Sequence, residues 1–194
     1  MIELRNVVVA YESRVILDSV NLTINDGETL VILGGSGSGK STLLRLLIGL
    51  QRPTSGQIIV DGTDITTLSE DEFNTVRRKM GMVFQYSALF DSMSVGENVA
   101  FGLRQHTKLG EDEIKRIVAE RLDWVGLKGY ESYMPNELSG GMKKRVSLAR
   151  AIALDPSLIL YDEPSSGLDP ITSGTISMLR SEEHTSELQS LRRI

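Results

Sequence analysis

Short apolar runs bounded by turn residues characterise the first 86 residues of the chain. This pattern predicts strands over residues 4–10, 22–24, 29–33, 57–60 and 80–84. A turn at Asp26-Gly27 is expected between the second and third of these strands, and another at Asp61-Gly62 after the fourth. The N-terminal part of the chain is therefore predicted to be rich in short strands.

Helical spacing of apolar residues appears first at 43–50 and then dominates between residues 94 and 154. Ser69, followed three residues later by Glu72, has the pattern of a capping box at the start of another helix. Helices are also predicted over 111–125 and 139–154. The apolar face of the first of these two contains Ile114, Ile117, Val118, Leu122 and Val125.

The chain returns to a strand pattern at residues 158–161. We therefore predict an α/β core with an antiparallel β edge, formed by residues 1–86 and 156–179. A helical subdomain over residues 87–155 interrupts this core. The chain of 194 residues is long enough for one domain with such an insertion.

A glycine-rich segment lies between the predicted strand 29–33 and the predicted helix 43–50, and it fits the pattern G-x-x-x-x-G-K-[ST]. Its residues are Gly34, Gly35, Ser36, Gly37, Ser38, Gly39, Lys40, Ser41 and Thr42. Backbone N–H groups in such a loop, with the helix N-terminus behind it, bind phosphate. We expect Lys40 to reach the β- and γ-phosphates of a nucleotide and the Ser41 hydroxyl to ligate Mg²⁺. A glycine-rich turn matched by chance is the alternative, which the strand–loop–helix context disfavours.

Two further constellations lie at the ends of predicted elements. Asp162 and Glu163 follow the strand 158–161, where parallel sheets bind ligands. We expect Asp162 to meet Mg²⁺ and Glu163 to polarise the attacking water, the alternative being a solvated turn. Ser139 is placed as the N-cap of a helix that starts with Gly140 and Gly141. The start of this helix is either a capped helix end and nothing more, or a second phosphate-binding site. In the second case, two chains related by a two-fold axis would each place this helix start at the nucleotide of the other.

Composition narrows the function classes further. The net charge is −5, with no long basic stripe, so nucleic acid is not expected as a partner. The chain has no cysteine, which excludes disulfides and thiolate metal sites. No apolar run approaches 18 residues, so a membrane role would need a partner subunit.

Five motifs occur in an order that resembles the ATP-binding-cassette (ABC) ATPases. They are the phosphate loop, Gln85 after the strand 80–84, Leu138-Ser139-Gly140-Gly141, Asp162-Glu163 and Ser166-Gly167-Leu168-Asp169. The resemblance extends to about residue 179. It implies the P-loop NTPase fold of that family and a head-to-tail homodimer with two sandwiched ATP molecules.

The resemblance also implies roles for individual residues. Tyr11 matches the aromatic residue that stacks on adenine, although it could instead be a packing residue at a strand end. Gln85 matches the residue that contacts Mg²⁺ and the attacking water and reports to the membrane subunit, although it could instead be a polar residue at a strand end. Asp169 matches a loop residue at the dimer interface, a role compatible with capping the helix that starts at Pro170. Contacts to the γ-phosphate of the partner chain are implied for Ser139, Gly140 and Gly141.

The segments 85–107 and 134–142, with Met142 where many importers have Gln, are similar to the ATPase subunits of Mla-type transporters. This similarity implies phospholipid transport between the inner and outer membranes, with the chain peripheral on the cytoplasmic face of the inner membrane. The implied partners are a membrane permease, an Mce-domain lipid-binding protein and a small regulatory subunit. The alternatives are another small-solute importer and a soluble ABC ATPase acting on DNA or ribosomes, which would usually carry a coiled-coil insertion or tandem cassettes.

The last residues depart from the family pattern. Residues 180–190 resemble a translated sequencing adapter and contain no apolar strand, so we predict that 180–194 is a non-native tail on a C-terminally truncated cassette. His184 lies too close to Glu163 in sequence to be the family's switch histidine. A further alternative is therefore that this chain binds nucleotide without turning it over.

Overall fold

The computed structural model describes residues 1–12 and 14–162. It consists of two units, Met1–Met80 and a second that begins at Gly81, which we describe separately as unit 1 and unit 2. The predictions for Glu163, for Asp169, for a helix starting at Pro170 and for the tail 180–194 concern residues outside the described ones.

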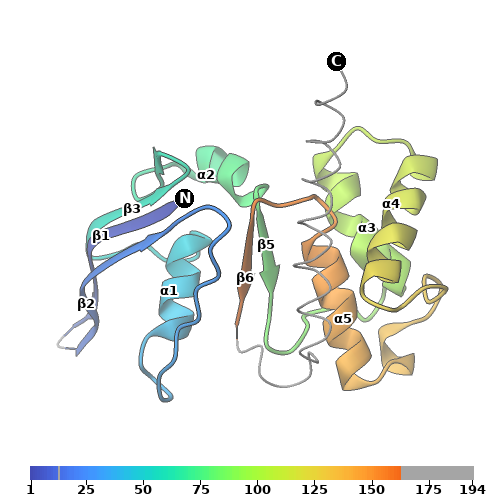
Figure 1. Cartoon of the computed structure of the whole chain (residues 1–194), viewed down its shortest axis with the longest axis horizontal. Coiled ribbons are helices and arrows are strands. Elements are labelled where there is room, and N and C mark those ends of the chain that lie inside the picture. Colours follow the sequence, from blue (N-terminus) through green and yellow to red (C-terminus); the bar gives the residue numbers. More distant parts are fainter. Residues whose placement is uncertain (13, 163–194) are drawn as a thin grey trace, which may run out of the picture. The chain divides into compact units, whose positions relative to one another are not determined.

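Unit 1 contains a four-stranded antiparallel sheet in the order β2–β1–β3–β4 (Figure 1). The strands are β1 (Ile2–Tyr11), β2 (Arg14–Ile24), β3 (Ser55–Val60) and β4 (Thr63–Asp64). They contain the strands expected at 4–10, 22–24 and 57–60. Asp61 and Gly62 form the predicted turn between β3 and β4, with φ values of 48° and 77°, as a two-residue hairpin turn of right-handed twist requires.

A bulge in β1 explains why its sequence does not alternate regularly. Ile2 and Leu4 are buried, and so are Val7 and Val9, so the buried positions change from even to odd numbers at Asn6. The pairing with β2 shifts between Leu4 and Val7, as an inserted residue would cause. All four side chains therefore face one core, although strict alternation would expose two of them.

Helices α1 (Lys40–Leu47) and α2 (Glu70–Arg77) complete unit 1. The predicted capping box starts α2: Ser69 N–H donates to Glu72 Oε2 (2.9 Å), and Glu72 N–H donates to Ser69 Oγ (3.4 Å). The core of the unit combines one face of the sheet with apolar side chains of both helices. Its buried residues include Ile2, Leu4, Val7, Val9, Leu43, Leu46, Leu47, Ile58, Val60 and Phe73.

The strand expected at residues 29–33 is wrong as a secondary-structure prediction. Residues 28–35 have no helix or strand structure, and the exposed fractions are 69% for Val31 and 88% for Leu33. An apolar run becomes a strand only when a neighbouring backbone pairs with it. In the part of the chain that the structure describes, no strand pairs with 29–33.

Unit 2 combines a two-stranded sheet with three helices. Its elements are β5 (Met80–Val83), α3 (Val95–His106), α4 (Glu111–Trp124), the 3₁₀ turn η1 (Pro135–Glu137), α5 (Gly140–Ala151) and β6 (Leu158–Tyr161). The three helices contact one another pairwise and enclose a core to which β5 contributes Val83. The predicted strand at 158–161 and the predicted helices 111–125 and 139–154 are confirmed to within three residues at each end.

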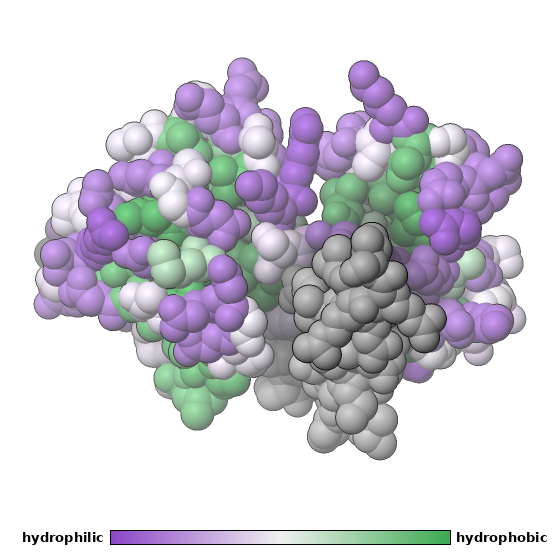
Figure 2. All heavy atoms as spheres, turned by 45° about the horizontal axis from the view of Figure 1, so that its top comes forward, coloured by the Kyte–Doolittle hydropathy of each residue, from purple (hydrophilic) through white to green (hydrophobic). Residues whose placement is uncertain are grey.

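On the face shown in Figure 2, hydrophilic residues make up much of the visible coloured surface, with hydrophobic residues between them. None of the helices within residues 1–12 and 14–162 is long and apolar enough to cross a membrane.

Candidate functional site

At two positions of the glycine-rich loop of unit 1, an added side chain would force neighbouring atoms to move. A Cβ atom added to Gly34 would lie 2.5 Å from Ser38 Oγ. One added to Gly39 would lie 2.8 Å from Leu17 Cδ2 and 3.3 Å from the Ile16 carbonyl oxygen, and Gly39 has a φ of 93°. That backbone conformation is one that residues with side chains rarely adopt. At Gly39 the loop therefore packs closely against β2, whereas at Gly34 it packs against its own Ser38.

Lys40 turns back across the loop. Its Nζ donates to the carbonyl oxygens of Gly34 (2.8 Å) and Gly35 (3.0 Å). The ammonium group is therefore held beside the loop backbone, where an anion bound by the loop would meet it. Its contact with the phosphates stays a prediction.

The start of α1 is electrostatically suited to an anion. Gly39 is the N-cap and makes no side-chain cap hydrogen bond, and the first turn contains no acidic residue. The partial positive charge of the helix N-terminus is consequently not offset by a carboxylate there. Ser41 and Thr42 lie in this first turn and are partly exposed.

Tyr11 is the last residue of β1, where it pairs with Arg14 of β2. Its side chain is 53% exposed, so it does not serve as a packing residue of the core. An exposed aromatic ring at a strand end is available to stack on a planar ligand. Its role in adenine stacking stays a prediction.

In unit 2, Gln85 and Asp162 leave the same edge of the small sheet. The Asp162 amide donates to the Val83 carbonyl oxygen (3.0 Å), so the ends of β5 and β6 lie side by side (Figure 1). Tyr161, which precedes Asp162, is partly buried, and this burial raises the pKa of its phenol. The structure thus brings the predicted Mg²⁺ ligand Asp162 to the edge from which the Gln85 segment begins.

The start of α5 carries Ser139, Gly140 and Gly141. Ser139 is the N-cap, and its Oγ accepts a hydrogen bond from the Met142 amide (3.3 Å). All three residues are exposed, and a Cβ atom at Gly140 or Gly141 would meet nothing within 4 Å. The chain's own packing therefore does not require glycine at either position. The predicted site residues that the structure describes thus lie in the glycine-rich loop and at Tyr11 in unit 1, and at the end of the small sheet and the start of α5 in unit 2.

Two buried or partly buried polar side chains of unit 2 escaped the sequence analysis. Asn98, in the first turns of α3, is fully buried, and Arg150, in the last turn of α5, is half-buried. Both hydrogen-bond the segment that follows Gln85. Arg150 interrupts the apolar run Leu148-Ala149-Arg150-Ala151-Ile152, which is a signal that could have identified it.

The described residues contain no cluster of three or more His, Asp or Glu side chains able to hold a metal ion. Mg²⁺ typically takes only one or two protein ligands together with phosphate oxygens. The oxygen donors of Ser41 and Asp162 fit that kind of site in their chemistry.

The family model described as ABC transporter matches residues 17–166. The chain belongs to the ABC transporter family. These residues are part of the family's ATP-binding and ATP-hydrolysing cassette, and the predicted family and fold class are confirmed.

Several ABC transporter proteins resemble the chain along most of its length. The intermembrane phospholipid transport system ATP-binding protein MlaF of Haemophilus influenzae is 50% identical over 179 residues, which is 92% of this chain and 68% of that protein. MlaF of Escherichia coli K12 is 46% identical, over 94% of this chain and 68% of its own length. The probable ribonucleotide transport ATP-binding protein mkl of Mycobacterium tuberculosis is 51% identical, but the chain spans only 50% of its length.

Solved ABC structures have the same fold. The dimeric ATP-binding cassette MJ0796 bound to ADP and Pi superposes with a TM-score of 0.82 at 36% identity, covering 91% of this chain and 79% of that one. The structure of cbiO1 from Clostridium perfringens, part of the transporter complex cbiONQ, gives a TM-score of 0.80 at 34% identity, covering 95% and 74%.

Proposed function

We propose that the protein energises phospholipid transport between the inner and outer membranes by binding and hydrolysing ATP. The observation that carries this proposal is the 50% identity with MlaF of Haemophilus influenzae over 92% of the chain. In this proposal the protein is a homodimer, bound to a membrane permease on the cytoplasmic face of the inner membrane. An Mce-domain lipid-binding protein and a small regulatory subunit are proposed as further partners.

The proposed nucleotide site starts from the glycine loop. Backbone N–H groups of the loop and the start of α1 bind the phosphates, and the Lys40 ammonium exchanges its two carbonyl partners for phosphate oxygens. Tyr11 stacks on adenine. The division into a nucleotide-binding core, residues 1–86 with 156–179, and a helical subdomain, residues 87–155, is also part of this proposal.

Hydrolysis is assigned to residues at the strand ends. Ser41, Gln85 and Asp162 would hold Mg²⁺, which offsets the charge of the phosphates when bound. Glu163 orients and deprotonates the attacking water, while Lys40 stabilises the charge that develops on the transferred phosphoryl group.

The start of α5 supports a site shared between two chains. Glycine is a weaker helix former than alanine, and nothing in the described chain crowds Gly140 or Gly141, the first two residues of α5. Their small size is explained if the phosphates of a nucleotide held by the partner chain approach this helix start. Asp169 is proposed to lie at the same interface between the two chains of the homodimer.

A second candidate substrate is a ribonucleotide, because mkl of Mycobacterium tuberculosis is 51% identical to the chain. Both candidates share the ATPase chemistry and differ in what the permease carries. The greater share of MlaF that the chain covers, 68% against 50%, favours phospholipid.

The test is ATP-dependent transfer by the complete protein, co-purified with its permease and placed in vesicles that contain fluorescent phospholipid. We expect ATP to drive phospholipid transfer, Glu163→Gln to bind ATP with almost no turnover, and Lys40→Ala to lose ATP binding. Transfer of ribonucleotide without any phospholipid transfer would show that ribonucleotide is the substrate. Full ATP turnover by Glu163→Gln would show that Glu163 does not activate the attacking water.

A further inference from the structure

The segment that follows Gln85 is held by a guanidinium group from α5. Arg150 Nη1 donates to the Ala88 carbonyl oxygen (2.7 Å), and Nη2 donates to the Ser87 carbonyl oxygen (3.0 Å). Ser87 and Ala88 have φ values of 64° and 46°. Two successive residues with side chains in the left-handed region are strained, and such strain persists only where surrounding contacts impose it.

The two hydrogen bonds of Arg150 are well suited to impose this conformation. Burial lowers the pKa of its guanidinium, which nevertheless stays protonated, so both bonds are charge-assisted. The planar fork of arginine supplies two nitrogens with fixed spacing, and lysine has no equivalent. The ring of Phe90 lies 5.9 Å from the guanidinium carbon and covers the same group.

The other end of the segment is anchored by Asn98 of α3, which is 0% exposed. Its Oδ1 accepts from the Phe90 amide (2.8 Å), and its Nδ2 donates to the carbonyl oxygens of Phe90 (3.0 Å) and Met93 (3.1 Å). Residues from Phe90 onward are thus fixed to α3. Arg150 therefore acts on the part of the segment nearest Gln85.

Helix α5 connects this contact to Gly140 and Gly141. Arg150 lies in its last turn, and Ser139 caps its first. We propose that Arg150 is a positioning residue that sets the backbone of residues 86–88, and through it the position of Gln85, relative to the helix that carries Gly140 and Gly141. This inference rests on the proposed function of Gln85 in ATP hydrolysis.

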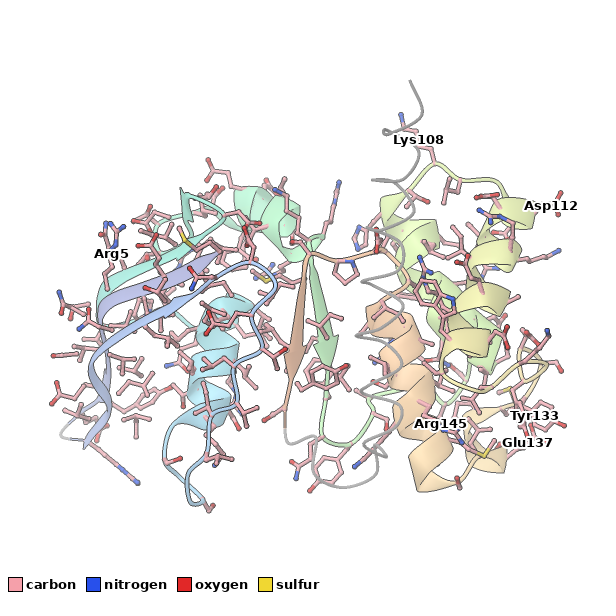
Figure 3. All side chains as sticks on the ribbon, viewed as in Figure 1. Arg5, Lys108, Asp112, Tyr133, Glu137 and Arg145 are labelled. Atoms are coloured by element: carbon pink, nitrogen blue, oxygen red, sulfur yellow. The ribbon has the colours of Figure 1, made fainter. Side chains whose placement is uncertain are left out.

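The same helix offers a matched control. Arg145 also donates to loop carbonyls, those of Val125 (3.2 Å) and Gly126 (3.3 Å), but through Nη1 alone and toward the loop after α4 (Figure 3). It has the same residue type, the same helix and the same kind of acceptor. A general effect of removing an arginine from α5 would therefore appear in both Arg145→Gln and Arg150→Gln, whereas a specific effect on residues 86–88 would appear in Arg150→Gln alone.

The first experiment is hydrogen exchange of the complete protein, read by mass spectrometry. The amides of Ser87 and Ala88 donate to Phe84 (3.0 Å) and Tyr86 (2.7 Å), so they report on this turn. We expect Arg150→Gln to speed exchange at these amides about tenfold and to leave α3 and α4 unchanged. Arg145→Gln should leave residues 86–88 unchanged. Unaltered exchange at 86–88 in Arg150→Gln would overturn the proposal.

The second experiment measures steady-state ATP turnover. With the phosphate loop intact, Arg150→Gln should lower kcat about tenfold and change KM for ATP less than twofold. Arg150→Lys keeps the charge and the alkyl stem, so it should fold normally and have an intermediate kcat. A wild-type kcat in Arg150→Gln would overturn the positioning role. A rise in KM for ATP as large as the fall in kcat would also overturn it. Because the exchange result needs no ATPase activity, it separates failure of this inference from failure of the proposed function.

Discussion

The starts of α1 and α5 look alike in sequence and differ in what their glycines do. Both helices begin in a glycine-rich segment, and neither has an acidic residue in its first turn. At α1, Gly39 is forced by a φ of 93° and by Leu17, whereas Gly140 at α5 has open space around it. A glycine that its own chain requires reveals a fold constraint. A glycine that the packing of its own chain does not require indicates that a ligand or another chain approaches that position.

The largest effect is expected at α1. Gly39→Ala combines a left-handed backbone with a Cβ contact of 2.8 Å to Leu17, and strain plus overpacking should cost about 3 kcal/mol. Chemical denaturation should show this loss, and calorimetric titration should show that ATP binding is lost with it. Gly35→Ala is the control, because a Cβ there meets nothing within 4 Å and should leave stability unchanged. Equal stability of the two variants would contradict the steric difference between Gly39 and Gly35.

The second effect concerns turnover at α5. Gly140→Ala should leave the melting temperature unchanged or raised, because alanine favours a helix, yet it should lower ATP turnover about tenfold, or about 1.4 kcal/mol in the barrier. The added methyl group would obstruct the nucleotide of the partner chain. Gly110→Ala, at the open start of α4, should leave turnover unaffected. Normal turnover in Gly140→Ala would contradict a shared site at this helix.

A smaller effect is expected from the cap that α5 has and α1 lacks. Ser139→Ala removes the side-chain acceptor of the Met142 amide, which should cost about 1 kcal/mol of stability. Urea unfolding of the wild type and the variant measures this loss. Ser139→Asp retains a capping oxygen and should recover most of it. No recovery would show that the serine acts by something other than capping.

The smallest effect concerns α2, whose first turn is acidic. Glu72 accepts hydrogen bonds from the Ser69 hydroxyl and amide, and these lower its pKa from the usual 4.5. Because the folded-state pKa is the lower one, the carboxylate stabilises α2 above about pH 4.5, and this contribution disappears as the pH falls through the folded value. Melting of the wild type and of Glu72→Gln should therefore converge on acidification. A gap that persists unchanged would rule out this linkage.

Much of the fold and of the candidate site was predictable because it depends on short-range patterns. The capping box at Ser69 and Glu72, the Asp61-Gly62 turn and the helices of unit 2 all follow from residues within a few positions of one another. The phosphate motif is equally local. The strand expected at 29–33 failed because an apolar run does not specify the backbone that must pair with it.

The sequence by itself determined the family, the order of the motifs and the residue types that can bind phosphate and Mg²⁺, since these depend on chemistry and spacing along the chain. Tertiary structure alone decided that the chain's own packing favours glycine at position 39 and leaves position 140 open, because the neighbours of a Cβ come from distant segments. It also decided that Arg150 reaches Ser87 and Ala88, 63 and 62 residues away in sequence. Contacts across such separations depend on packing, which no local pattern encodes.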